Sequence, residues 1–396
     1  MPDWITTFVQ DTEGIQSPES FRLWTAITII SGALERRVWT ETRKGILYPN
    51  QFTILCGFPA SGKTLMINEA RRYWLDIPEF HIGPDNPTRR SFLDSLQHST
   101  RSYTNGSGAV IYSAMSLPSP ELRVFFGSGD EDFFGTMTDL YDNKDQFSAP
   151  RSLSNRGGSV LIERPTVNIL GGATPSYLGS VFPEAAWSDG FTSRLIFIYG
   201  AEIHDPTTDW FEKRQWLTRD NLKHDLNKIF CLAGEFLWQP DAMKALNEWF
   251  SQKLPPVPSH PRLYHYRGRR GPHVLKLSMI SAVSYHQSLT VTLGDFLRAK
   301  QWLLDAETTM PDVFRAMKQK SDEQVIKEAY QCVYSMFSSV VREKRQPINE
   351  SVLWEFLQER TTSDKIKGII EAMERSDLIR RGVKPGTFIP QPRQDP

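Results

Sequence analysis

The stretch Cys56-Gly57-Phe58-Pro59-Ala60-Ser61-Gly62-Lys63-Thr64 decides the fold that this sequence predicts. Residues 57–64 match the pattern G-x-x-x-x-G-K-[ST], in which a glycine-rich loop wraps around phosphate groups. The six residues before the loop read as a short buried strand, and residues 65–74 read as the helix that follows. A plain glycine-rich turn is the alternative, but the strand–loop–helix order favours a nucleotide site.

The residue types in this loop each suit phosphate chemistry. Gly57 and Gly62 let backbone N–H groups approach the phosphates, and the start of the helix adds a partial positive charge. Lys63 can reach the β- and γ-phosphates, while the Thr64 hydroxyl can complete the shell of a Mg²⁺ ion. We therefore expect ATP and Mg²⁺ as ligands. The expected contacts are Gly57, Pro59, Ala60, Ser61, Gly62, Lys63 and Thr64, with Thr64 on the metal.

The composition is ordinary for a globular protein and excludes several classes. With 396 residues the chain has room for more than one core, and its net charge of +0 means that nucleic acid would need local basic patches. It has neither a long apolar run nor the pattern of a signal peptide, so we expect no membrane partner and a cytoplasmic location. Three cysteines far apart argue against disulfides and zinc.

Three residues are expected to assist hydrolysis. Glu121 is the only acid near the end of the strand predicted at 109–113, and we assign it to water activation, against an ordinary acid in a first helical turn. Thr174 ends a buried strand over 165–175 and could orient the attacking water. Arg194 precedes another apolar strand and needs an anion partner, either a neighbouring subunit's γ-phosphate or an intramolecular carboxylate.

In their order and spacing these segments resemble the primase-helicase-type P-loop ATPases of phages and mobile elements, which are related to AAA+ and superfamily-3 helicases. The resemblance covers roughly residues 17–310. It is carried by Ser17-Pro18-Glu19-Ser20-Phe21 through Arg37, the loop at 57–64, Ser119-Pro120-Glu121-Leu122, Leu140-Tyr141-Asp142, Ile169-Leu170-Gly171-Gly172-Ala173-Thr174-Pro175 and Gly190-Phe191-x-x-Arg194.

The resemblance implies a role for several residues and partners. Thr174 would be the sensor-1 residue and Arg194 an arginine finger. The chain would form a ring with copies of itself, as a hexamer, on single-stranded or forked DNA in a bacterial or phage-infected cell, with a separate primase or polymerase as a further partner. One departure is that the acidic pair of an ordinary Walker B motif is reduced to Glu121.

The most basic window of the chain, residues 260–276, lies between predicted helices that resemble an AAA+ lid. Arg270 or Lys276 would then act as a sensor 2 that closes on the nucleotide. Contact with nucleic acid through Arg267 and Arg269, or a solvated basic turn, are the alternatives. The predicted hairpin or exposed loop at 146–164 carries Arg151 and Arg156, which would contact DNA or simply lie on the surface.

The last block, residues 321–396, reads as three helices followed by a two-stranded wing, which is the pattern of a winged helix. Its basic residues suit phosphate contacts, although winged helices also dock proteins. The DNA-contacting residues expected here are Lys365, Lys367, Arg380, Arg381 and Lys384.

The sequence thus predicts an α/β protein with an AAA+/RecA-like P-loop fold, meaning a parallel sheet flanked by helices, a helical lid and a C-terminal winged helix. The predicted divisions are a lead-in at 1–50, an ATPase core at 51–204, a lid at 205–318 and a winged helix at 319–396. The leading function is an ATP-driven DNA helicase, the second is a helicase loader or replication-initiation ATPase, and a small-molecule kinase is the third.

Overall fold

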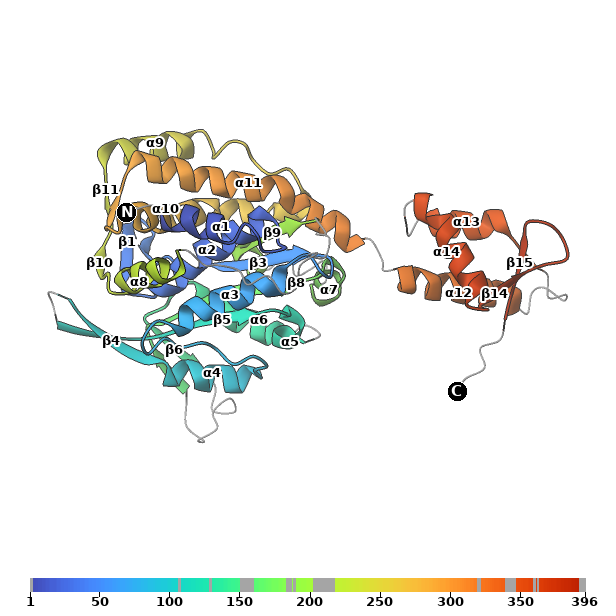
Figure 1. Cartoon of the computed structure of the whole chain (residues 1–396), viewed down its shortest axis with the longest axis horizontal. Coiled ribbons are helices and arrows are strands. Elements are labelled where there is room, and N and C mark those ends of the chain that lie inside the picture. The colour runs from blue at the N-terminus through green and yellow to red at the C-terminus, as the bar shows by residue number, and fades with distance from the viewer. Residues whose placement is uncertain are drawn as a thin grey trace. The chain divides into compact units, whose positions relative to one another are not determined.

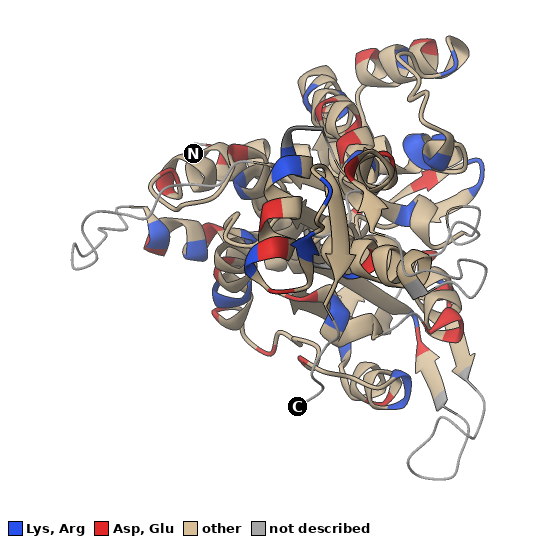
Figure 2. Ribbon diagram, turned by 90° about the vertical axis from the view of Figure 1, so that its right-hand side faces the viewer, with Lys and Arg blue, Asp and Glu red and all other residues tan. Residues whose placement is uncertain are grey.

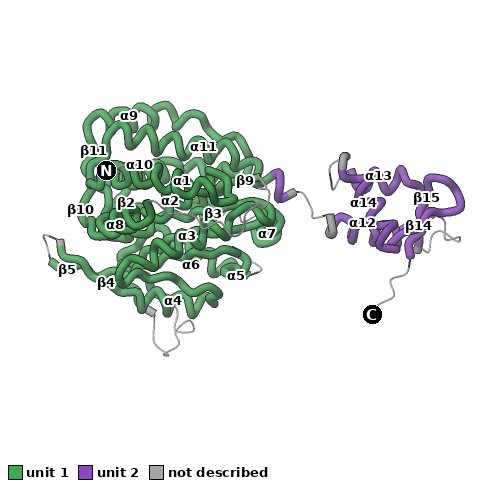
Figure 3. The backbone as a smooth tube through the Cα atoms, viewed as in Figure 1, with its two compact units in different colours: residues 1–314 green, residues 315–396 purple. Residues whose placement is uncertain are grey.

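A five-stranded sheet organises the larger of two compact units in this computed structural model. The units comprise residues 1–314 and 315–396 (Figure 3). The structure describes residues 3–391 except 106–107, 128–129, 150–159, 183–186, 188–189, 202–217, 319–321, 339–346, 359–360 and 362. The strand order is β4–β5–β8–β3–β9 (Figure 1). The strands are β3 (Phe52–Gly57), β4 (Thr100–Asn105), β5 (Gly108–Ser119), β8 (Pro165–Ala173) and β9 (Leu195–Gly200).

The sheet is mixed, with one antiparallel edge. Strands β5, β8, β3 and β9 run parallel, and β4 runs antiparallel to β5. Every residue of β3 and β8 is buried, as expected of central parallel strands. The predicted α/β class is therefore confirmed. No strand was predicted for residues 100–105, because the polar side chains of this edge strand resemble a loop.

Helices flank both faces of this sheet. Successive strand residues face opposite sides of a sheet, so the neighbours of Gly171 and Gly172 in β8 identify the helix on each face. A Cβ atom on Gly171 would lie 2.8 Å from Leu122 of α5 (Leu122–Phe126), and one on Gly172 would lie 3.0 Å from Ile67 of α3 (Lys63–Leu75). Helix α2 (Glu19–Leu34) is almost entirely buried and packs on α3 and β8.

The other elements of the larger unit surround this centre; the predicted lead-in and core lie within it, and the predicted lid (205–318) runs past its end at Phe314. The hairpin expected at 146–164 is present, with residues 146–149 paired antiparallel to residues 160–163, and a capping box between Thr292 and Asp295 opens a long helix. The elements are α1 (Trp4–Asp11), β1 (Val38–Thr42), β2 (Gly45–Leu47), α4 (Arg89–His98), α6 (Glu131–Tyr141), β6 (Gln146–Ala149), β7 (Val160–Glu163), α7 (Pro175–Val181), η3 (Thr192–Arg194), α8 (Arg219–Phe230), β10 (Gly234–Glu235), β11 (Leu237–Trp238), α9 (Pro240–Ser251), η4 (Pro261–Leu263), η5 (Tyr266–Arg269), α10 (Arg270–His286), β12 (Thr290–Val291) and α11 (Leu293–Lys318).

Residues 315–396 build a small unit around their own apolar core, which includes Val325, Leu357, Ile366 and Phe388. Its three short strands form an antiparallel sheet in the order β13–β15–β14. The elements are α12 (Asp322–Ser338), β13 (Ile348–Asn349), α13 (Glu350–Gln358), α14 (Ser363–Arg375), β14 (Ile379–Arg381) and β15 (Thr387–Pro390). Across the described residues, none of the helices is both long enough and apolar enough to cross a membrane.

Candidate functional site

The loop between β3 and α3 is held in shape by its two glycines. A Cβ atom on Gly57 would lie 2.6 Å from the Gly200 carbonyl oxygen, so only glycine lets β3 and β9 end side by side. Gly62 has a φ of +80°, and a Cβ there would lie 2.2 Å from the carbonyl oxygen of Gln16. The segment before α2 therefore closes directly on the loop, which brings the start of α3 to the carboxyl end of β3.

Lys63 folds its side chain into this loop. Its Nζ donates to the carbonyl oxygens of Gly57 and Phe58 at 2.8 and 2.6 Å, and to Ser61 Oγ at 3.0 Å. Burial lowers the pKa of the ammonium group, while the nearby Cys56 opposes the shift. Thr64, at the next position, is exposed. The loop therefore concentrates a cation, a hydroxyl and the start of a helix at one point, which suits an anionic ligand.

Glu121 and Thr174 lie at the same edge of the sheet as this loop. Glu121 comes two residues after β5 ends, and Thr174 comes directly after β8 ends; Cys56 of β3 pairs with Ala173 of β8. Glu121 is exposed, which leaves its carboxylate accessible to solvent. The Thr174 hydroxyl caps α7 by accepting from the backbone N–H of Tyr177 at 3.3 Å. Both predicted residues are therefore brought to the carboxyl edge of the sheet.

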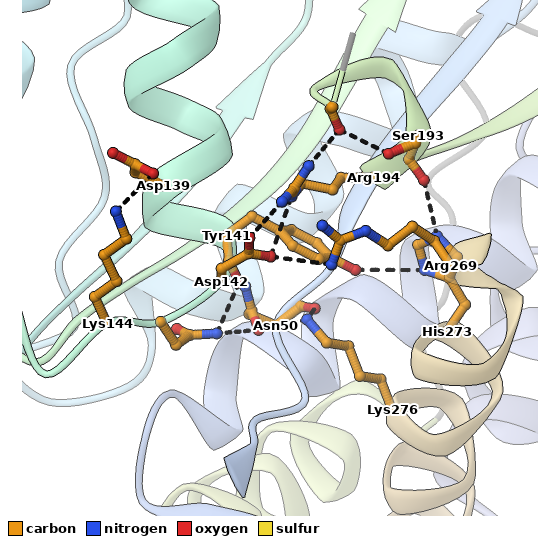
Figure 4. A network of polar contacts seen from close by, with 12 residues as sticks. Asn50, Asp139, Tyr141, Asp142, Lys144, Ser193, Arg194, Arg269, His273 and Lys276 are labelled. Carbon is orange, nitrogen blue, oxygen red and sulfur yellow. Dashed lines mark hydrogen bonds and ion pairs between the residues drawn. The ribbon is translucent and has the colours of Figure 1, made fainter. Parts of the chain in front are cut away.

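Arg194 lies at the opposite edge, because it precedes β9 whereas the loop follows β3. The six residues of β3 separate the two edges by about 20 Å. The Arg194 guanidinium binds the Asp142 carboxylate through two nitrogens, with Nε 3.1 Å from Oδ1 (Figure 4). Arg269 also reaches Asp142, with Nη1 3.3 Å from Oδ1. Burial raises the pKa of Asp142, but its hydrogen bond and charge interaction with Arg194 outweigh this and leave the pKa lowered. The intramolecular carboxylate considered from the sequence is therefore present.

The structure does not bring Arg270 or Lys276 to the loop. The Arg270 side chain, at the start of α10, is buried against Glu307 of α11, with Nε 2.7 Å from Oε1, because a buried guanidinium needs an anionic partner. Lys276 donates to the backbone and side-chain oxygens of Asn50 at 2.9 and 2.7 Å (Figure 4). Asn50 precedes β3, so Lys276 also lies at the edge opposite the loop. In this arrangement neither residue has the position expected of a sensor 2.

His273 belongs to the same group and is fully buried. Its ring nitrogens lie 3.4 Å from the Tyr141 hydroxyl and 3.4 Å from the Ser193 carbonyl oxygen (Figure 4). Burial, followed by the charge of Lys276, lowers the pKa of His273 from 6.5 to about 3. The imidazole is therefore neutral in the folded protein at neutral and mildly acidic pH.

A dependence of stability on pH follows from this shift. Between pH 6.5 and 3 the unfolded His273 binds a proton that the folded one does not, so stability falls as the pH is lowered. This residue alone should contribute a slope of about 1.4 kcal/mol per pH unit inside that window. We expect His273→Gln to flatten the dependence of the melting temperature on pH between 6.5 and 4.5, and the matched exposed control His224→Gln to leave it unchanged. Equal slopes in the parent and His273→Gln would contradict the assignment.

The residues proposed for nucleic acid are distributed over both units. Basic and acidic residues are interspersed on the helices rather than gathered in one block (Figure 2). Arg269 is engaged by Asp142, and Arg381 by Glu374, whose Oε1 lies 2.8 Å from the Arg381 Nε. Lys365, Lys367, Arg380 and Lys384 are exposed, and Arg267 is half-buried near the ring of Tyr264. Arg151 and Arg156 lie outside the described residues.

From the sequence an intramolecular carboxylate was one candidate partner of Arg194, but neither Asp142 nor the link between Asn50 and Lys276 was identified. The available signal for the pair of Arg194 and Asp142 was the segment Leu140-Tyr141-Asp142, in which an acidic residue follows the apolar end of a helix. No group of histidine, cysteine and acidic side chains able to hold a metal occurs among the described residues.

The geometry therefore defines an α/β protein with a glycine-rich strand–loop–helix at the carboxyl edge of its sheet. No protein-family model matches the chain, and no curated protein sequence matches it either.

Proposed function

We propose that the protein is an ATP-driven, oligomeric DNA motor that acts as a helicase. The proposal rests first on the loop at 57–64, where the Lys63 ammonium, the Thr64 hydroxyl and the first turn of α3 meet at the end of a buried parallel strand. In this proposal the loop is a P-loop that holds the phosphates of ATP, Thr64 completes the shell of a Mg²⁺ ion, and Glu121 activates the attacking water from the same sheet edge.

The single observation that favours an oligomer is the position of Arg194. It lies at the sheet edge opposite its own loop, so it cannot serve the nucleotide of its own chain without a large rearrangement. An arginine that approaches the loop of a neighbouring copy would complete a shared site, as an arginine finger does. Residues 315–396, with three helices and a small antiparallel sheet, support a winged helix that presents Lys365, Lys367, Arg380 and Lys384 to DNA phosphates.

The decisive experiment measures the ATPase rate of the full chain with and without single-stranded DNA, together with the particle mass in a nonhydrolysable ATP analogue. We expect DNA to stimulate hydrolysis and the analogue to raise the mass to that of a ring. A monomeric mass with no stimulation by DNA would contradict the motor.

A helicase loader or replication-initiation ATPase is the second candidate. It is favoured by the end of β5, where Ser119-Pro120-Glu121 supplies one exposed carboxylate in place of an acidic pair. ATP would then control assembly rather than drive steady movement. Strand displacement on a forked duplex separates the two candidates, because robust unwinding with ATP excludes a pure loader.

A further inference from the structure

A pocket lies at the amino edge of β5, away from the loop at 57–64. It has a volume of 790 Å³, within the range of small-molecule sites. Its lining includes Arg37, which follows α2, together with Arg101 and Ser102 of β4. The pairing of Arg101 with Tyr112, and of Ser113 with Pro165 at the start of β8, places this pocket at the edge where β8 begins. The segment before helix α2 contacts the loop at 57–64, and the residues after this helix reach the pocket.

The pocket buries more positive charge than the adjacent acid can balance. The side chains of Arg37, Arg101 and Glu35 are 9%, 8% and 3% exposed. Glu35 is the one buried acid beside the two arginines in the described part of the chain, with Oε1 3.2 Å from Arg101 Nη1 and Oε2 4.0 Å from Arg37 Nε. Glu79 also lines the pocket, but it is exposed, so water screens its charge. One buried guanidinium charge therefore remains in excess.

The hydrogen-bonding capacity shows the same imbalance. The Tyr112 hydroxyl donates a hydrogen bond to Glu35 Oε2 at 2.6 Å, so this oxygen has less capacity to accept from the arginines. Arg101 Nε and Nη2 and Arg37 Nε are buried without a hydrogen-bond acceptor among the described residues, and Arg101 Nη1 faces Glu35 Oε1 at 3.2 Å without the geometry of a hydrogen bond. Buried polar groups normally have a partner, and an unpaired buried donor costs about 1–3 kcal/mol. These donors are therefore suited to the oxygen atoms of a bound anion.

Two aromatic rings form apolar walls beside the arginines. The Arg37 guanidinium lies 3.8 Å from the centroid of the Phe230 ring, and Arg101 lies 5.5 Å from the same ring and 5.6 Å from that of Phe80. Stacking restrains guanidinium planes and leaves their edges free to bind oxyanions. His81 also lines the pocket, and burial, followed by the charge of Arg101, lowers its pKa, which favours a neutral ring.

We propose that this pocket binds a small organic anion, whose phosphate or carboxylate group pairs with Arg101 and Arg37 and whose flat apolar part lies by Phe80 and Phe230. This site is separate from the loop at 57–64, so it adds a second ligand to the protein. Glu35 acts in the pocket as an internal competitor, because it already neutralises part of the charge that the ligand would meet.

The experiment titrates the full chain carrying Lys63→Ala with phenyl phosphate, benzoate and inorganic phosphate by calorimetry, so that tight binding at the loop does not obscure the result. Phenyl phosphate or benzoate should bind more tightly than inorganic phosphate, because only they can use the aromatic walls. Stronger binding of phenyl phosphate would identify a phosphate ligand, and stronger binding of benzoate a carboxylate.

Two substitutions should then act in opposite directions. Arg101→Gln should lower the affinity for the anion at least about tenfold, the effect of losing a charge-assisted hydrogen bond. Glu35→Gln, which is nearly isosteric, should strengthen it, because the competing charge is gone; a purely structural cluster would not respond in this way. The proposal is overturned if neither aromatic anion binds, or if Arg101→Gln binds them as tightly as its parent does. It is also overturned if folded Glu35→Gln binds them no more tightly, or if Arg101→Gln lowers only the affinity for single-stranded DNA.

Discussion

Replacing Lys63 with alanine should lower the ATPase rate by about 10²-fold or more, the effect expected when a positive group on a transferring phosphate is removed. Lys63 is the one cation in the loop at 57–64, and its Nζ lies within hydrogen-bonding distance of three loop oxygens. The same geometry that directs it inward places it beside any phosphate that the backbone of the loop would bind.

The measurement is steady-state ATP hydrolysis by the full chain, with nucleotide binding followed in parallel by a fluorescent analogue. Lys44→Ala is the matched control, because Lys44 is an exposed lysine in the turn between β1 and β2. It should keep parental activity. Activity within a factor of three of the parent in a folded Lys63→Ala protein would remove the loop from the mechanism, and with it the proposal of an ATP-driven motor.

Local pattern predicted the parts of the fold that depend on neighbours in sequence. The strand, loop and helix around Gly57–Thr64 follow from an apolar run, two glycines and an amphipathic segment, and the structure has them as β3 and α3. The capping box at Thr292–Asp295 is a local pattern of the same kind, because a cap is a contact between residues three apart.

Tertiary pairing limited the prediction of the site. Arg194 and Asp142 are 52 residues apart, and Arg270 and Glu307 are 37 apart, so no local spacing joins them. A run of basic residues reads alike whether it faces solvent, DNA or a buried carboxylate. Arg270 was assigned to the nucleotide for that reason, although in the fold it pairs helix α10 with Glu307 of α11. Strand β4 was missed because polar residues at a sheet edge resemble a loop.

Replacing Arg194 with alanine should leave ATP binding intact and lower hydrolysis by about 10³-fold, if this arginine serves a neighbouring subunit. The residue is buried and bound to Asp142, so in the proposed mechanism it exchanges that carboxylate for the phosphate of the next chain. Arg269, which also reaches Asp142, would keep the carboxylate paired during the exchange.

Mixing Arg194→Ala protein with Lys63→Ala protein tests the shared site directly. Each chain is inactive alone, but about a quarter of the interfaces in a random ring would join an intact loop to an intact arginine, so activity should reappear. Asp142→Asn separates the two roles of Arg194: it breaks the internal ion pair but keeps the arginine. A finger predicts that Asp142→Asn retains most of the hydrolysis that Arg194→Ala loses. If both variants lose hydrolysis equally and mixing restores none, Arg194 acts only through its ion pair, and the case for a ring would then rest on particle mass alone.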